Sequence, residues 1–144
     1  MLVHQILAAK GGGEVFTVPP ETTITEACET LSARRIGALI ISRDGSEPLG
    51  IVSERDIVRE LGRRGSSILS HDVTEVMTTD LVTCEGPETA DSVMTKMTSG
   101  RFRHMPVMQA GAMIGLISIG DVVKARLSEL AMEKDALEGM IKGF

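Results

Sequence analysis

The stretch GIVSERDIVR at residues 50–59 decides the fold, because it returns as GLISIGDVVK at residues 115–124. Both copies carry the pattern Gly-x-x-Ser-x-x-Asp, in which the two positions after the glycine are apolar. The agreement extends upstream, over most of residues 21–41 and 87–107. A repeat of this length indicates a fold built from two copies of one unit.

Apolar and turn-forming residues follow one order within each copy, and that order predicts strand, helix, strand, strand, helix. The first strand is ended by Pro19-Pro20, since proline cannot donate to a sheet. Thr22 or Thr23 can cap the helix that follows, with Glu26 completing a capping box. The second helix opens at a serine, which is a favourable N-cap, and is closed by a glycine. In the first copy, strands are predicted at residues 15–18, 38–42 and 49–52, and the second helix from Ser53 to Gly62.

The predicted fold class is α/β (α+β), with two βαββα repeats packed sheet to sheet around a pseudo-twofold axis. A unit of about 50 residues is too small to bury its own sheet face, so the copies are expected to form one globule. A helix from Val3 is predicted to stop at Gly11-Gly12-Gly13, and a longer amphipathic helix is expected from Gly120 to Ile141. The predicted parts are an N-terminal helix and glycine-rich linker at 1–14, a first repeat at 15–62, a connector at 63–80, a second repeat at 81–128 and a C-terminal helical extension at 129–144.

The composition argues against several classes of partner. The 144 residues include 20 acidic and 15 basic side chains, for a net charge of −5, so nucleic acid is not expected. No apolar run approaches the roughly 20 residues of a membrane span, and the start of the chain lacks signal-peptide features, so we expect a cytoplasmic protein without a membrane partner. Cys28 and Cys84 are expected to be small buried hydrophobic residues.

The repeated serine and aspartate are the candidate binding groups. Ser53 and Asp56 lie where a strand runs into a helix, and Ser118 and Asp121 repeat this arrangement. Backbone N–H groups at a helix start suit a phosphate, and an ionised aspartate can accept from two ribose hydroxyls. The alternative is structural, because serine also caps helices and a first-turn aspartate stabilises the helix dipole.

Taken together, the two motifs and their Thr-rich strand-to-helix turns resemble a tandem pair of CBS domains, the family named after cystathionine β-synthase. The resemblance covers nearly the whole chain, which therefore resembles the stand-alone bacterial proteins that consist of one CBS pair. It implies that an adenine nucleotide such as AMP, ATP or NAD(H) binds between the copies, and that the chain forms a flat homodimer. The helices after the two motifs, at residues 57–61 and 122–130, are expected to pair in that dimer.

The resemblance also implies which residues line two clefts, because each Ser/Asp pair would face the other copy. The first cleft would hold Ser53, Arg55, Asp56, Val82, Thr83, Arg101, Phe102, Arg103, His104 and Met105. The second would hold Phe16, Thr17, Val18, Ile36, Gly37, Ala38, Ser118 and Asp121. For the apolar residues, and for Phe16 in particular, ordinary core packing is the alternative.

Basic residues gather around the first cleft although the chain is acidic. Arg101, Arg103 and His104 form one cluster, and guanidinium groups bind phosphates bidentately. Four more arginines follow the first Ser/Asp pair; of these, Arg55 is favoured as a phosphate ligand, whereas Arg59, Arg63 and Arg64 fit a solvated helix face. The first cleft is therefore expected to prefer the more highly phosphorylated or dinucleotide ligand.

Enzyme chemistry is not expected from this sequence. His4, His71 and His104 lack metal-ligand spacing, and the sequence contains neither a Walker phosphate loop nor a Gly-x-Ser-x-Gly nucleophile elbow. The favoured function is a regulatory energy or redox sensor that passes ligand occupancy to a regulated protein, which the sequence does not identify. The alternative is a ligand-free dimerising scaffold or interaction protein.

Overall fold

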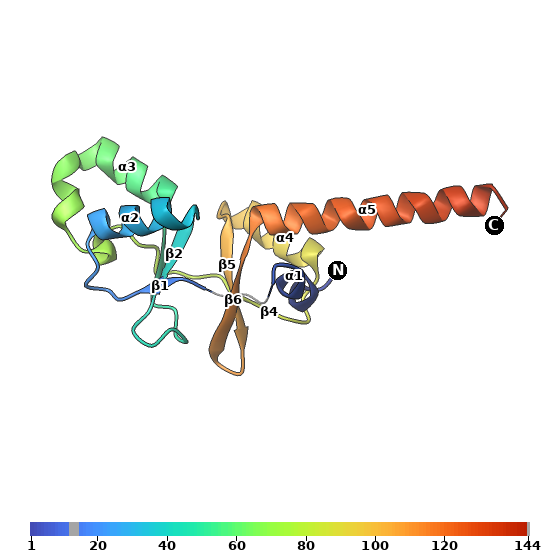
Figure 1. Cartoon of the computed structure of the whole chain (residues 1–144), viewed down its shortest axis with the longest axis horizontal. Coiled ribbons are helices and arrows are strands. Elements are labelled where there is room, and N and C mark those ends of the chain that lie inside the picture. Colours follow the sequence, from blue (N-terminus) through green and yellow to red (C-terminus); the bar gives the residue numbers. More distant parts are fainter. Residues whose placement is uncertain (12–14, 144) are drawn as a thin grey trace. The chain divides into compact units, whose positions relative to one another are not determined.

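The computed structural model describes residues 1–11 and 15–143 (Figure 1). Gly12 and Gly13 of the expected glycine stop lie outside the described residues. The elements in chain order are α1 (Val3–Ala9), β1 (Thr17–Val18), α2 (Ile24–Arg34), β2 (Ala38–Ile41), β3 (Gly50–Ser53), α3 (Glu54–Arg64), η1 (Ser66–Ser70), η2 (Val73–Glu75), β4 (Cys84–Glu85), α4 (Ala90–Gly100), β5 (His104–Gln109), β6 (Ala112–Ser118) and α5 (Ile119–Ile141).

Both repeats have the predicted order of strand, helix, strand, strand, helix. Each forms a three-stranded sheet, in the orders β1-β2-β3 and β4-β5-β6. In the first sheet β1 runs parallel to β2, and β2 runs antiparallel to β3. In the second sheet β4 is parallel to β5. The predicted mixed α/β fold class is confirmed.

The chain divides into two compact units, where the sequence led us to expect one globule. One unit consists of residues 1–13, 83–108 and 115–144, and the other of residues 14–82 and 109–114. Each unit has its own cluster of buried apolar side chains. Each unit also contains a segment from outside its repeat, and the packing of the two repeats into one globule stays a prediction.

The added segments are the N-terminal segment, which packs with the second repeat, and the connector, which packs with the first. The N-terminal segment completes the second repeat, where the Val3 N–H donates to the Glu88 carbonyl at 2.8 Å. The connector completes the first repeat, where the Val73 N–H donates to the Thr22 carbonyl at 2.8 Å. Their apolar residues enter the two cores: Val3, Ile6 and Leu7 in one, and Ile68, Val73 and Val76 in the other.

The glycine of each motif lies where a segment from outside the repeat approaches its sheet closely. A Cβ on Gly50 would lie 2.5 Å from the Met77 sulfur of the connector, and a Cβ on Gly115 would lie 2.9 Å from the Leu7 methyl groups of α1. Both distances are shorter than van der Waals contact permits. The glycine of each motif is therefore the point at which the added segment reaches its sheet.

Helix α3 ends later than predicted. Gly62 was expected to close it, but the helix continues to Arg64 and ends at Gly65, whose φ is 81°. Glycine adopts this left-handed region without strain, as a helix stop requires. The two added residues, Arg63 and Arg64, form ion pairs with Glu60 and Glu75 at 3.0 Å each. Helix α5 agrees with its predicted span to within one residue.

The dimer surface expected on α3 is smaller than the sequence suggested. Ile57 is 3% exposed and lies in the core of its unit, and Leu61 packs against that core. Val58, 67% exposed, is the apolar side chain that α3 presents to solvent. Among the described residues, none of the helices combines the length and apolar character that crossing a bilayer needs.

Candidate functional site

The first Ser/Asp pair forms a complete capping box at the start of α3. Ser53 has extended backbone angles and its hydroxyl oxygen accepts from the Asp56 N–H at 3.3 Å. Asp56 Oδ2 accepts in return from the Ser53 N–H at 2.9 Å and from the Ser53 hydroxyl at 2.9 Å. The structural role proposed for this pair is therefore real. Any ligand would have to share the carboxylate with the cap.

The second pair repeats this geometry at the start of α5. The Asp121 N–H donates to the Ser118 hydroxyl at 3.2 Å, and Asp121 Oδ2 accepts from the Ser118 N–H at 2.9 Å. The motif thus builds the same local structure in both copies because serine and aspartate are spaced as N-cap and third helical residue.

Each aspartate also accepts from a cation, but the two cations come from different places. Asp56 Oδ1 pairs with Arg59, one turn along α3, at 3.0 Å. Asp121 Oδ2 pairs with Lys10, just after α1, at 2.8 Å, and the same ammonium donates to the Leu116 carbonyl at 3.0 Å. Burial would raise the pKa of Asp121, but the bonds from Lys10 and Ser118 outweigh it and hold the pKa below its usual value.

The start of each second strand borders the Ser/Asp motif of its own repeat. Ala38 is the register partner of Ser53, and the Glu54 N–H donates to the Gly37 carbonyl at 3.0 Å. In the other unit, the Ile119 N–H donates to the Arg103 carbonyl at 2.8 Å. The sequence analysis did not identify this neighbourhood within one repeat. The grouping of these residues across the two copies stays a prediction.

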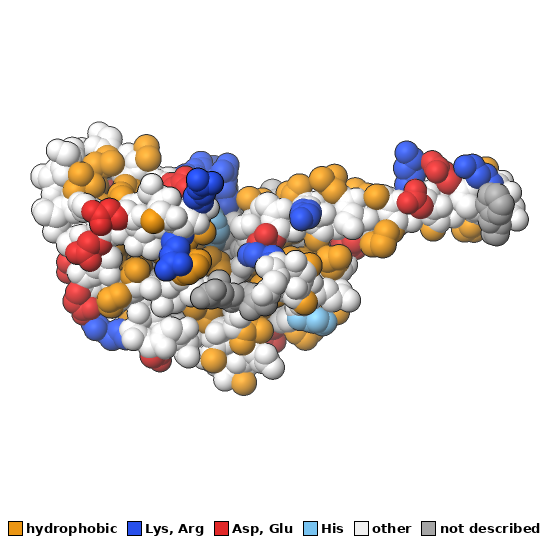
Figure 2. All heavy atoms as spheres, in the orientation of Figure 1, with side chains coloured by type: hydrophobic (Ala, Val, Ile, Leu, Met, Phe, Trp, Pro, Cys, Tyr) orange, Lys and Arg blue, Asp and Glu red, His pale blue; other side chains and the backbone are white. Residues whose placement is uncertain are grey.

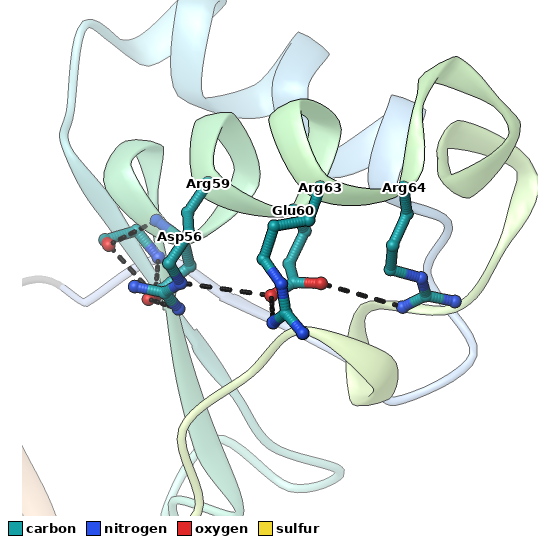
Figure 3. A network of polar contacts seen from close by, with 6 residues as sticks. Asp56, Arg59, Glu60, Arg63 and Arg64 are labelled. Atoms are coloured by element: carbon teal, nitrogen blue, oxygen red, sulfur yellow. Dashed lines mark hydrogen bonds and ion pairs between the residues drawn. The ribbon is translucent and has the colours of Figure 1, made fainter.

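A ladder of ion pairs occupies one side of α3 (Figure 3). Arg59 contacts Asp56, and Arg63 contacts Glu60 at 3.0 Å. Arg64 pairs with Glu75 at 3.0 Å and lies 3.9 Å from Glu60, a buried carboxylate at the centre of the ladder. The alternative interpretation of Arg59, Arg63 and Arg64, a charged helix face, fits these contacts because their charges are already neutralised within the unit.

Three other arginines of the candidate site take no part in this ladder of ion pairs. Arg55, Arg101 and Arg103 are exposed, and none has a carboxylate within 4.0 Å among the described residues. Arg101 also has a φ of 58°, a left-handed conformation that is unfavourable for a residue with a Cβ. His104 follows them at the start of β5 and is half-buried. These guanidinium groups are the ones that can neutralise an anionic ligand without breaking an existing pair.

The apolar candidates divide into exposed and buried residues. Met105 is 0% exposed and belongs to the core of its unit, and Ala38 is 5% exposed, so both side chains fit the core-packing alternative. Their place in the clefts stays a prediction. Phe16 is half-buried against the core, with the Arg34 guanidinium 4.3 Å above its ring centroid. Phe102 packs against the core of the other unit. Of the remaining candidates, Val82 and Thr83 are exposed, and Thr17, Val18, Ile36 and Gly37 are half-buried.

The cysteines do not form a reactive centre. Burial raises the pKa of the Cys84 thiol to about 12 and also raises the pKa of the Cys28 thiol. Cys84 is buried, as expected, but Cys28 is only half-buried. Within residues 1–11 and 15–143, no cluster of three or more His, Cys, Asp or Glu side chains could hold a metal ion.

Lys10 is the site residue that the sequence analysis missed. It lies at the end of a short helix far along the chain from Asp121, and no spacing rule connects the two. The available signal was indirect: the helix ahead of the first copy corresponds to the connector ahead of the second. Such a correspondence does not reveal which repeat the helix contacts.

Comparison with known proteins agrees with this geometry. The family model for the CBS domain matches residues 13–63 and 73–128. The CBS domain-containing protein CBSX3, mitochondrial, of Arabidopsis thaliana is 31% identical over 98% of this chain and 72% of its own length. The crystal structure of the CBS-domain containing protein ATU1752 from Agrobacterium tumefaciens has a TM-score of 0.84 at 44% identity, covering 88% of this chain and 99% of that one.

A further solved relative contains a ligand. The CBS domain protein PAE2072 from Pyrobaculum aerophilum, complexed with AMP, has a TM-score of 0.77 at 26% identity and covers 92% of this chain and 99% of that one. Two family matches in register, together with two copies of the Ser/Asp capping box, show that the chain belongs to the CBS domain family as a tandem pair.

Proposed function

We propose that this chain is a regulatory module that binds an adenine nucleotide, of the AMP, ATP or NAD(H) type. The observation that carries the proposal is the pair of strand-to-helix junctions at Ser53–Asp56 and Ser118–Asp121, where a carboxylate lies beside helix N–H groups. A ribose can donate to the carboxylate while its phosphate accepts from the helix start. The AMP complex of the Pyrobaculum relative supports this ligand class.

The two sites would differ in charge. The first combines Ser53, Arg55 and Asp56 with Arg101 and Arg103, a grouping that rests on the family resemblance. Arginines without a carboxylate partner can take over the negative charge of several phosphates. The second has Lys10 as its cation, and this ammonium is already bound to Asp121. ATP or a dinucleotide therefore fits the first site better, and a less charged adenosine ligand fits the second.

Regulation by binding, without catalysis, is the role that we propose for the module. The Cys84 thiol is buried and has a raised pKa, so it is unsuited to nucleophilic chemistry. Nucleotide occupancy would instead be transmitted through a homodimer to a regulated protein. A ligand-free dimerising scaffold is the competing function.

Thermal unfolding with added nucleotides tests the proposal. AMP, ADP, ATP, NADH and S-adenosylmethionine are each added to the full chain, and at least one should raise the unfolding midpoint, because a ligand that binds only the folded state stabilises it. The double variant Asp56→Asn and Asp121→Asn should lose that shift. Asp135→Asn, on the exposed face of α5, is the matched control and should keep it. A flat response of the unmodified chain to every ligand would favour the scaffold.

A further inference from the structure

The carboxylate of the first motif is largely occupied by groups of the protein itself. Arg59 donates to Asp56 Oδ1 at 3.0 Å, and Oδ2 accepts from the Ser53 N–H and the Ser53 hydroxyl at 2.9 Å each. A carboxylate offers about four acceptor positions, so these bonds leave about one of them open. Figure 3 shows the ion pair between Arg59 and Asp56 on α3.

The carboxylate of the second motif is more open. Asp121 Oδ2 accepts from the Ser118 N–H at 2.9 Å and from Lys10 at 2.8 Å. Across the part of the chain that the structure describes, Asp121 Oδ1 accepts no hydrogen bond. The position that matches Arg59 is Lys124, which is exposed and lies within 4.0 Å of no described carboxylate. The two repeats therefore differ at Oδ1, where the first is covered by a cation and the second is not.

The position of Arg59 allows it to exchange Asp56 for another anion. Its side chain is 57% exposed, whereas that of Asp56 is 13% exposed. Helical side chains lean towards the N-terminus, so the Arg59 guanidinium stays near the first turn of α3. Its Nε also lies 3.9 Å from the buried Glu60 carboxylate, which favours a cation at this place.

The Arg59 guanidinium keeps donors for a ligand. A guanidinium has five N–H donors in a planar fork, and the described residues accept from only one of its nitrogens. The remaining donors can bind a phosphate bidentately from the solvent side. In Figure 2, Lys and Arg side chains (blue) stand at the surface of the unit that contains α3. Arg59 can therefore contact a phosphate once it leaves Asp56.

We propose that Arg59 makes the first site select ligands that carry phosphate, an inference that rests on the nucleotide-binding function proposed above. A ribose has two vicinal hydroxyls, and the open position of Asp56 accepts from one of them. The second hydroxyl takes the place of Arg59 at Oδ1. Loss of a partly exposed ion pair weakens the binding of a ligand without phosphate by up to about fivefold. A nucleotide offsets this loss, because its phosphate binds the displaced guanidinium.

Calorimetric titration of the full chain with adenosine, AMP and ATP tests this selectivity. Every chain carries Asp121→Asn, so that the titration reports the first site. Arg59→Gln should bind adenosine up to about fivefold more tightly and ATP about tenfold or more weakly. Arg59→Lys keeps the charge without the planar fork and should retain part of the preference for ATP. Arg63→Gln is the matched control and should leave both affinities unchanged, because Arg63 lies one turn further along α3 and pairs with Glu60.

Opposite changes for the two ligands separate selectivity from a structural role, since damage to the fold would weaken adenosine and ATP together. Circular dichroism checks that the variants fold. The proposal is overturned if Arg59→Gln does not bind adenosine more tightly, or if it changes the ratio of ATP to adenosine affinity no more than Arg63→Gln does. Either result in a chain that binds ATP refutes the selectivity alone. An unmodified chain that binds none of the three ligands would overturn the nucleotide site and the selectivity with it.

Discussion

The Lys10 ammonium lies 2.8 Å from Asp121 Oδ2 and 3.0 Å from the Leu116 carbonyl, so the end of α1 is tied to the strand-to-helix junction of the second repeat. This carboxylate is one of the two that the sequence analysis predicts to bind a ligand. The corresponding Asp56 pairs instead with Arg59 of its own helix. The two copies thus share one capping motif but neutralise it with cations of different origin.

Removing the Lys10 charge should weaken the fold in a pH-dependent way. The folded pKa of Asp121 lies below the usual value of 3.8, so its ion pair contributes stability above that pH and loses it as the pH falls through the folded pKa. Lys10→Met should cost about 0.5–1 kcal/mol at neutral pH, as expected for a partly exposed pair. In urea unfolding, the difference from the unmodified chain should shrink below pH 3.8.

The matched control for this measurement is Lys142→Met, an exposed lysine near the end of the chain. It should leave the unfolding free energy unchanged at both pH values. A Lys10→Met deficit that persists undiminished in acid would show that Lys10 contributes through packing and not through Asp121.

Substitution of the two aspartates separates their capping role from ligand binding. Asp56→Ala or Asp121→Ala removes half of a capping box and should cost about 1 kcal/mol of stability. Asn in their place keeps an oxygen that can accept from the Ser53 or Ser118 N–H, so its cost should be smaller. Both substitutions should abolish nucleotide affinity at one site, because a ribose needs the remaining acceptor capacity of the carboxylate.

Calorimetric titration and thermal unfolding of the four variants distinguish the two roles. If the Asn variants bind nucleotide as the unmodified chain does, the aspartates serve the helix starts alone. A loss of affinity in the Asn variants at nearly unchanged stability would identify the carboxylates as ligand groups.

Arg35 and Arg101 make a matched pair for a third prediction. They occupy corresponding positions after α2 and α4, and both have left-handed φ values, 54° and 58°. Because a Cβ is unfavourable in this region, Arg35→Gly and Arg101→Gly should each stabilise the fold by up to about 1 kcal/mol. Only Arg101→Gly should weaken ATP binding, since Arg101 belongs to the proposed first site. Equal effects on ATP affinity would remove Arg101 from that site.

Local chemistry explains what the sequence could predict. The order of strands and helices and the length of α5 depend on residues within a few positions of one another, and both were predicted. The capping boxes at Ser53 and Ser118 were expected only as serine caps, as the structural alternative to ligand binding. The capping box predicted at Thr23 is half formed, because Thr23 accepts from the Glu26 N–H without the reciprocal bond. The predicted end of α3 at Gly62 was wrong, because the helix continues to Arg64, whose guanidinium pairs with Glu75 of η2. Propensity is a weak signal where such tertiary contacts compete with it.

The features that the sequence did not predict depend on contacts between residues far apart in the chain. The N-terminal segment completes the second repeat and the connector completes the first, so neither Lys10 nor Leu7 could be assigned to its partner from spacing. Likewise, the six arginines of the candidate region (Arg55, Arg59, Arg63, Arg64, Arg101 and Arg103) look alike in sequence. Only the positions of Glu60 and Glu75 show that Arg63 and Arg64 are neutralised, whereas Arg55 and Arg103 have no carboxylate within 4.0 Å in the described part of the chain.

That difference among the arginines gives the last prediction, which concerns phosphate recognition. Arg103→Ala should weaken ATP binding by about 1.5–3 kcal/mol, the worth of a hydrogen bond to a charged group, and should weaken AMP binding less. Arg63→Ala is the control: its guanidinium already pairs with Glu60 at 3.0 Å, so ATP affinity should stay unchanged.

Salt provides the second measurement of the same contact. Added salt screens partly exposed charge pairs, so the ATP affinity of the unmodified chain should fall as ionic strength rises. The fall should be shallower for Arg103→Ala, because one of the screened pairs is missing. Two results would contradict this prediction: equal losses of AMP and ATP affinity in Arg103→Ala, or an ATP affinity of the unmodified chain that does not change with salt. Either result would assign Arg103 to the solvated surface and show that the basic cluster does not recognise phosphate.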